Sequence, residues 1–345
     1  MLKRLQKMTN KKILITGGAG YIGSHAVLAS LEKDYKVVVV DNLFRGYKQV
    51  VEVLQEKYGR DKLSFYNVDL TDKKSLEKVF AKEKPEAVMH FGALCLVNES
   101  TQNPDLYFNN NVVGSINLLS VMDKYNINRI VFSSTSEVYG ENKYLPMDEE
   151  HSLNPTNPYG LSKKMIEDVI IQYAKWKSLK YVIFRYFNVT GACDDGFVGD
   201  SKKPSVLLVQ NAVRGALGIE EFKLTCPTVE TRDGTPVRDY VNVMDLIDAH
   251  ILGLDYLNKG GKSDVFNLGT EKGYSVKEII SQVQDLTGVR FEVGKGEIRQ
   301  GEPAEKYAKA DKAKKILGWK PSRGIKESVE SLVKWYKNHP NGWQY

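Results

Sequence analysis

A glycine-rich segment near the start of the chain restricts the possible folds more than any other feature. It reads Gly-Gly-Ala-Gly-Tyr-Ile-Gly over residues 17–23 and follows the apolar run 13–16. Glycines at positions 17, 20 and 23 let a strand turn tightly into a helix, whose first N–H groups can then approach a pyrophosphate without obstruction by a Cβ atom. The segment predicts a dinucleotide-binding unit. The residues expected to contact the dinucleotide here are Gly17, Gly20, Tyr21, Ile22 and Gly23.

The end of the second apolar run, 37–40, indicates which dinucleotide is bound, because the run is followed directly by Asp41. A carboxylate at the end of the second strand accepts hydrogen bonds from the ribose hydroxyls of NAD and repels the 2′-phosphate of NADP. A glycine-rich turn in an unrelated α/β domain is the alternative. Strand, turn, helix, strand and acid follow in the order that dinucleotide binding requires, so we expect NAD.

The first half of the chain alternates β-branched apolar runs with helix-like segments. This alternation is typical of a parallel, doubly wound α/β sheet whose strands are buried on both faces. Ligands of such sheets bind in the crevice outside the carboxyl ends of the strands. The runs expected to form strands are 13–16, 37–40, 63–67, 87–91, 129–133 and 181–187.

The pattern loosens after residue 188 into loops rich in glycine and aspartate. A helix is expected around residues 205–215 and another from Ser275, with a short segment at 264–268 between them. These segments favour a smaller C-terminal lobe that covers the substrate. We therefore expect an extension over 1–10, a Rossmann domain over 11–188 to which parts of the C-terminal half return, and a substrate-binding lobe over 189–345.

Composition excludes several classes of function. The 49 basic and 43 acidic residues give a net charge of +6 without a long basic run, which argues against a role on nucleic acid or a membrane surface. No stretch approaches the roughly 18 apolar residues of a membrane span. The three cysteines are odd in number and far apart, which favours reduced thiols and a cytoplasmic location. The five histidines form no ligand pattern, so we expect no metal site.

The candidate catalytic pair is Tyr159 and Lys163, which lie four residues apart after Pro158. On a helix that begins at the proline, this spacing places the phenol and the ammonium on one face. Positive charge from the lysine and from a nicotinamide ring can lower the tyrosine pKa from about 10 toward neutrality. The motif alone is weak, because the same spacing also occurs at 58/62, 139/143 and 173/177.

A segment rich in hydroxyl groups, residues 131–140, distinguishes Tyr159 from the other tyrosines. It ends a predicted strand with Ser133 and Thr135. A hydroxyl at this place can bond a substrate oxygen beside the tyrosine. The alternative is an ordinary serine- and threonine-rich turn.

These motifs together resemble the extended short-chain dehydrogenase/reductases that act on nucleotide sugars, and over nearly the whole chain the UDP-glucose 4-epimerase family. Only the N-terminal extension falls outside the resemblance. Besides residues 17–23, Thr135, Tyr159 and Lys163, the matching segments are 21–25, 41–43, 97–100, 109–110, 185–188, 233–235, 238–240, 267–269 and 339–342.

The resemblance implies roles for further residues. On the cofactor side these are Asn42, Asp69, Leu70, Phe91, Asn110, Ser133 and Tyr186, together with Tyr159 and Lys163, and Asp69 and Leu70 lie at the adenine. On the side of the nucleotide sugar they are Thr135, Asn188, Arg238, Arg299 and Glu302. Arginine suits this second group, because its guanidinium makes bidentate bonds to phosphate.

The resemblance also implies a reaction. Tyr159, helped by Thr135, would take the proton of the sugar 4-hydroxyl while NAD takes the C4 hydride. The 4-keto sugar, held by UDP, would turn and receive the hydride on its other face. The family further implies a homodimer in which helices over 110–124 and 159–176 pair. Apolar positions at Val112, Ile116 and Leu119 allow this pairing, and burial in the core of one subunit explains them equally well.

Several residues depart from the family pattern. Cys95 replaces a lysine, Lys203-Pro204-Ser205-Val206 replaces a segment with Asn or His, and Lys306 stands where some relatives have a bulky Tyr beside the sugar, so an N-acetylated or pentose substrate remains open. The run Thr135-Ser136-Glu137 also resembles UDP-glucuronate decarboxylase, in which Glu137 would be an acid/base. Dehydratases of the same superfamily carry Thr-Asp-Glu at this place, and Ser136 in place of the aspartate counts against dehydration. A catalytically silent NAD-binding regulator is the third reading, although it predicts a lost Tyr or Lys.

Overall fold

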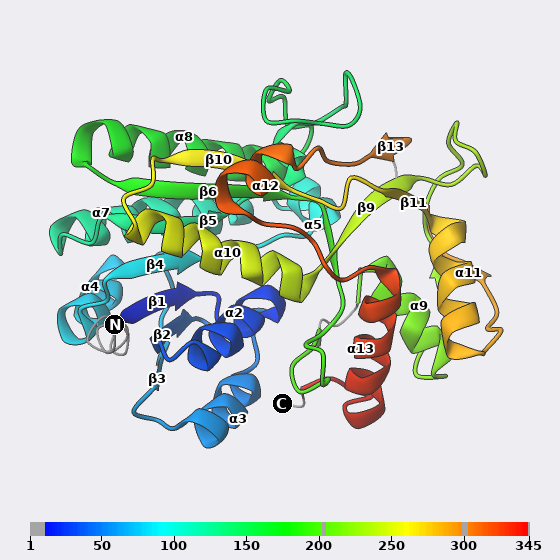
Figure 1. The fold of residues 1–345 in the computed structure, drawn as a ribbon, viewed down its shortest axis with the longest axis horizontal. Coiled ribbons are helices and arrows are strands. Elements are labelled where there is room, and N and C mark those ends of the chain that lie inside the picture. Colours follow the sequence, from blue (N-terminus) through cyan, green and yellow to red (C-terminus); the bar gives the residue numbers. More distant parts are fainter. Residues whose placement is uncertain (1–10, 202–204, 299–302, 344–345) are drawn as a thin grey trace.

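The computed structural model describes residues 11–201, 205–298 and 303–343. Its centre is a seven-stranded parallel sheet in the order β10-β6-β5-β4-β1-β2-β3 (Figure 1). The prediction of a doubly wound α/β sheet is therefore confirmed. The strands are β1 Lys12–Thr16, β2 Lys36–Asp41, β3 Leu63–Asn67, β4 Ala87–His90, β5 Arg129–Ser133, β6 Lys180–Tyr186 and β10 Asp264–Leu268.

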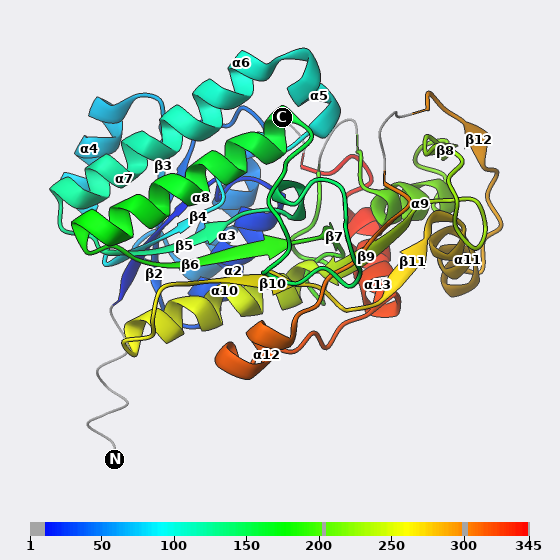
Figure 2. The ribbon, with the colours of Figure 1, turned by 90° about the horizontal axis from the view of Figure 1, so that it is seen from above.

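Helices cover both faces of this sheet, because consecutive residues of its central strands are apolar and point alternately to opposite faces. In β2, Val37 and Val39 enter one core, whereas Val38 and Val40 enter the other. Figure 2 shows α7 and α8 on one side of the sheet and α10 on the other. The first core includes α2 Tyr21–Glu32, α3 Lys48–Tyr58 and α10 Val243–Asn258, and the second includes α4 Lys73–Glu83, α7 Gly114–Lys124 and α8 Pro158–Lys177.

The segment 264–268, read from sequence as part of the smaller lobe, forms an edge strand of the main sheet. β10 pairs in parallel with β6, from Asp264 beside Val182 to Leu268 beside Tyr186. α10 precedes it and packs on β5 and β6. The C-terminal half thus returns to the sheet here, and the domain boundary near residue 188 stays a prediction.

Most of the remaining elements gather beyond the carboxyl ends of the main strands, at the right of Figure 1, whereas α12 packs against β10 and α10. A small sheet joins β11, β9 and β13, and β7 pairs with β9. Ser275 and Glu278 form a capping box at the start of α11, close to the helix start expected from sequence. The elements are β7 Asn188–Thr190, α9 Leu208–Ala216, β8 Lys223–Leu224, β9 Val237–Asn242, β11 Gly273–Ser275, α11 Val276–Thr287, β12 Gly294–Lys295, β13 Glu305–Lys306, α12 Asp311–Leu317 and α13 Ile325–Asn338.

Short helical segments connect β4 to α7 and β5 to α8. They are α5 Val97–Gln102, α6 Pro104–Tyr107, the π-helical η1 Phe108–Val113 and the 3₁₀ turn η2 Ser136–Val138. Within the described parts of the chain, no helix is both long enough and apolar enough to cross a membrane.

Candidate active site

The glycine-rich turn lies between β1 and α2 and needs glycine for steric reasons. Gly17 has a φ of +69°, and a Cβ atom there would lie 2.7 Å from the backbone nitrogen of Gly92. A Cβ atom on Gly23 would lie 2.0 Å from the carbonyl oxygen of Gly17. The absence of side chains lets β1 and α2 come together closely. The start of α2 therefore faces a pocket at the carboxyl edge of the sheet.

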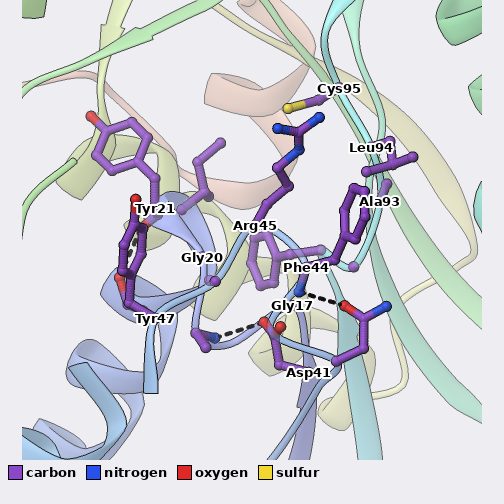
Figure 3. A pocket seen from close by; sticks show the side chains of 18 of the residues that line it. Gly17, Gly20, Tyr21, Asp41, Phe44, Arg45, Tyr47, Ala93, Leu94 and Cys95 are labelled. Atoms are coloured by element: carbon purple, nitrogen blue, oxygen red, sulfur yellow. Dashed lines mark hydrogen bonds between the residues drawn. The ribbon is translucent and has the colours of Figure 1, made fainter. Parts of the chain in front are cut away.

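Asp41, the last residue of β2, lies on the wall of this pocket (Figure 3). Its carboxylate accepts hydrogen bonds from the backbone N–H of Ala19 at 3.0 Å and of Leu43 at 2.8 Å. Burial raises the pKa of the carboxyl group, which these two bonds oppose. The turn and the second strand thus fix the carboxylate in one orientation, as ribose recognition requires.

Most of the residues expected to bind the cofactor line this one pocket. They are Gly17, Gly20, Tyr21, Ile22, Gly23, Asp41, Asn42, Leu70, Phe91, Asn110, Tyr159, Lys163 and Tyr186. Asp69 and Ser133 do not line it. Asp69 instead accepts a bond from the side chain of Asn42 at 2.7 Å and holds that wall residue in place.

The catalytic candidates come from two elements. α8 starts at Pro158 after Asn157, whose side chain accepts a bond from the Gly160 N–H at 2.8 Å. This cap brings the first turn of the helix, with Tyr159, beside the end of β5. The phenol of Tyr159 is hydrogen bonded to the side chain of Thr135, and the Lys163 ammonium donates to the carbonyl oxygen of Ser133 at 2.8 Å. The structure therefore brings together the tyrosine, the lysine and the threonine identified from sequence.

Burial controls the protonation of this group. It raises the pKa of Tyr159 well above its usual value, and the hydrogen bond from Thr135 opposes that shift only in part. Burial also lowers the pKa of Lys163 to about 8. The sequence predicted that Lys163 favours the phenolate, but its ammonium is directed at the Ser133 carbonyl. A second positive charge beside Tyr159 is therefore needed for it to act as a base near neutral pH.

Ser133 supports the site from behind the pocket. Its hydroxyl donates to the Tyr186 hydroxyl at 3.1 Å and lies 3.1 Å from Nε2 of His250. Its carbonyl holds Lys163. Ser133 thus orients two pocket residues without facing the pocket.

The residues expected on the substrate side lie beyond Thr135, toward the small sheet. Asn188 starts β7, and Arg238 lies in β9, where its guanidinium donates to the carbonyl oxygen of Val237 at 2.9 Å. Arg299 and Glu302, also expected here, lie outside the described residues.

An ion pair that the sequence did not reveal lies next to Thr135. Glu137 accepts a bond from the Lys306 ammonium at 2.7 Å and another from the side chain of Asn157 at 3.0 Å. Burial alone would raise the Glu137 pKa, but the charge and hydrogen bond of Lys306, with Asn157 and Arg238, hold it below its usual value. Glu137 is therefore a paired carboxylate.

The rim of the cofactor pocket includes residues that sequence reasoning missed. Phe44, Arg45 and Tyr47 follow β2, and Ser201 and Trp343 come from the C-terminal half. The Tyr47 hydroxyl donates to the Ser201 carbonyl at 2.5 Å, and the backbone N–H of Trp343 donates to the Ser201 hydroxyl at 2.9 Å. The only signal for Trp343 was its place directly after the matching segment 339–342. In the described residues, no three His, Cys, Asp or Glu side chains are grouped to hold a metal ion.

The chain matches known proteins over nearly its whole length. Residues 14–332 match the family model described as GDP-mannose 4,6 dehydratase. Over 335 residues the chain is 42% identical to a UDP-glucose 4-epimerase of Lactobacillus helveticus, covering 96% of this chain and 99% of that one. The chain belongs to the UDP-glucose 4-epimerase family.

Two other members show the breadth of this epimerase family. A UDP-glucose 4-epimerase from Bifidobacterium longum, solved in complex with NAD⁺ and UDP, superposes with a TM-score of 0.90 at 35% identity, covering 96% of this chain and all of that one. UDP-arabinose 4-epimerase 1 of Arabidopsis thaliana is 39% identical over 96% of this chain and 80% of its own length. Family membership thus leaves the sugar open between hexose and pentose.

Proposed function

We propose that this protein interconverts UDP-sugars that differ in configuration at C4, with UDP-glucose and UDP-galactose as the reference pair and NAD as the cofactor. The observation that carries the proposal is that Tyr159 and Lys163 line the pocket formed by the glycine-rich turn and Asp41, with Thr135 hydrogen bonded to Tyr159. Tyr159 and Lys163 are both present and line this pocket, which counts against a catalytically silent regulator.

The residues present fit NAD. A Cβ atom at Gly17 or Gly23 would fill the space that a pyrophosphate needs, and Asp41 presents a fixed carboxylate for the ribose. NAD, when bound, supplies hydride transfer and a positively charged ring. The charge of that ring is what the raised pKa of Tyr159 requires.

The chain's own residues then handle the proton and the orientation of the sugar. Tyr159 takes the proton from the 4-hydroxyl and returns it in the reverse step. Thr135 bonds the same oxygen, and Lys163 keeps the end of β5 in contact with α8. Asn188 and Arg238 hold the diphosphate, so that the sugar itself is free to turn between the two half-reactions.

Two features argue against elimination or decarboxylation. The sequence resemblance places an aspartate at position 136 in dehydratases, and here it is Ser136, which is buried. Glu137, the candidate acid of a decarboxylase, accepts hydrogen bonds from Lys306 and Asn157. A carboxylate held in this way is a poor proton donor, because its partners stabilise the ionised form.

The decisive experiment offers the purified protein UDP-galactose, UDP-N-acetylgalactosamine, UDP-xylose and UDP-glucuronate separately, without added NAD. An isomer of unchanged mass is expected from at least one of the first three, which also identifies the preferred sugar. In parallel, Tyr159→Phe is expected to lose about 10²–10⁴-fold in turnover while it still binds NAD and UDP, because only the proton-transfer group is removed. Release of carbon dioxide from UDP-glucuronate, or near wild-type turnover by the variant, would contradict the proposal.

We also propose that the protein forms a homodimer through α7 and α8. Both helices carry exposed apolar residues on the surface that they share with α6 and η1: Leu106, Val113, Ile116, Leu161 and Met165. Of the positions named from sequence, Ile116 is on this surface, but Val112 and Leu119 are buried within the subunit. Ile116→Glu should give a monomer by sedimentation. Ile316→Glu on α12, an equally exposed isoleucine, should not.

A cytoplasmic location is part of the same proposal. No disulfide joins the cysteines of the described residues, and Cys193 is buried. Reduced thiols suit a reducing compartment. Fractionation of cells that produce the protein should recover it with cytoplasmic markers.

A further inference from the structure

One positively charged side chain of the cofactor pocket, that of Arg45, has no role in the site described above. Arg45 follows β2 and lines the pocket together with Phe44 and Gly20. Figure 3 shows its side chain reaching across toward Cys95, which belongs to the segment after β4. The guanidinium thus extends from one side of the pocket toward the other.

Arg45 is held there by a fixed partner. Its guanidinium forms an ion pair with Glu99 of α5. The other carboxylate oxygen of Glu99 accepts a bond from the Tyr107 hydroxyl at 2.8 Å. Tyr107 is fully buried and also bonds the backbone of Leu96 at 2.8 Å. The anchor of Arg45 is therefore tied to the core and does not depend on flexible surface side chains.

Stability of the fold does not explain this ion pair. The side chains of Arg45 and Glu99 are 43% and 24% exposed, and ion pairs that water can reach add little to folding free energy. The charge of the pocket explains it better. Among the described residues that line the pocket, the basic side chains are those of Arg45 and Lys163. The Lys163 ammonium donates to the Ser133 carbonyl at the catalytic end. Arg45 is the cation that remains for a dianionic group.

We propose that Arg45 is a cofactor-binding residue whose guanidinium, positioned by Glu99, bonds the pyrophosphate of the dinucleotide. The five N–H groups of a guanidinium allow it to keep the carboxylate and still donate to a phosphate oxygen. The N–H groups at the start of α2 bind the pyrophosphate from one side, and Arg45 binds it from the rim. The inference rests on the proposed function, because it takes NAD as the ligand.

The test is the rate at which holoenzyme loaded with radiolabelled NAD exchanges it for free NAD, followed by rapid filtration. Arg45→Gln should speed exchange about tenfold or more, since a hydrogen bond to a charged group is lost. Arg45→Lys keeps the charge and should lie between Arg45→Gln and wild type. Lys48→Gln, which removes an exposed ion pair with Glu52 on α3, is the matched control and should exchange at the wild-type rate.

The outcomes separate this inference from the proposed function. Wild-type exchange by Arg45→Gln, or exchange by Arg45→Lys as fast as that of Arg45→Gln, would overturn the role of Arg45 and leave the epimerase proposal standing. Failure of the wild-type protein to bind NAD at all would instead contradict the proposed function. Circular dichroism of each variant checks that the fold is kept.

Discussion

The ion pair between Glu167 of α8 and Arg185 of β6 offers the sharpest test of how the site is held. Arg185 donates to Glu167 from Nη2 at 2.6 Å and from Nε at 3.1 Å, and the side chains are 6% and 1% exposed. The hydroxyl of Ser134, the residue before Thr135, also bonds this carboxylate. Glu167→Gln keeps the shape of the side chain and removes its charge. Arg185 then stays buried as a cation without an opposite charge, while its guanidinium still donates to the Tyr139 hydroxyl.

The size of the effect follows from this burial. Breaking a buried ion pair by removing one partner costs about 3–5 kcal/mol, because the other charge stays out of water. For 345 residues, an unfolding entropy of about 2.1 cal/mol/K per residue gives about 0.7 kcal/mol/K in total. The loss therefore corresponds to a fall in Tm of about 4–7 °C.

Thermal melts followed by circular dichroism measure the shift. Asp168→Asn is the matched control. Asp168 follows Glu167 on α8 and forms an exposed ion pair with Lys164 at 2.7 Å, so its substitution should change Tm by less than about 1 °C. Replacing both Glu167 and Arg185 by Met should recover much of the loss, since no charge then remains buried. A Glu167→Gln variant that melts within about 1 °C of the wild type would show that this buried ion pair does not stabilise the fold by the expected amount.

Three further predictions follow from the site. Asp41→Ala should weaken NAD more than NADP in equilibrium binding, because the lost carboxylate bonds the ribose; equal losses would disprove the ribose role. Glu137→Gln should keep epimerase turnover within about threefold, as measured by coupled assay, because the carboxylate is paired with Lys306 and is not a proton donor; a loss of about 10²-fold would make it catalytic. Burial lowers the pKa of His90 to about 3 and of His250 to about 4, so the unfolded chain takes up their protons first as pH falls. Stability should thus be unaffected by them above pH 7 and fall below about pH 6.5, by about 3 kcal/mol per pH unit for the two together; an unchanged urea midpoint between pH 7 and pH 5 would contradict this.

Most of the main sheet could be predicted from sequence, because the central strands β1, β2, β4 and β5 are mostly apolar runs whose residues are buried on both faces. The six runs named from sequence correspond to β1–β6 within one or two residues. β10 was assigned to the wrong part of the fold. Its five residues, Asp-Val-Phe-Asn-Leu, carry polar side chains at two positions and give no local sign of which sheet they join. Pairing with β6 is a long-range choice that a local pattern does not contain.

The site was predictable where one element carries several of its residues. The spacing of Tyr159 and Lys163 on a helix, and the hydroxyl groups at the end of β5, place the catalytic candidates together through local rules alone. The Glu137–Lys306 pair and the contact of Arg45 with Glu99 join segments far apart in the chain. Such contacts depend on how loops meet after folding, and no spacing or periodicity encodes them.

The late return of β10 also has a consequence for the newly made chain. β6 ends at Tyr186 and its outer neighbour at Leu268, so a ribosome must add every residue between them before that edge of the sheet can close. At about 5–20 residues per second this interval lasts about 4–16 s. During it, the N–H and C=O groups along β6 are open to pairing with another nascent chain. Protection of the growing polypeptide is therefore most needed while residues 187–268 are being translated.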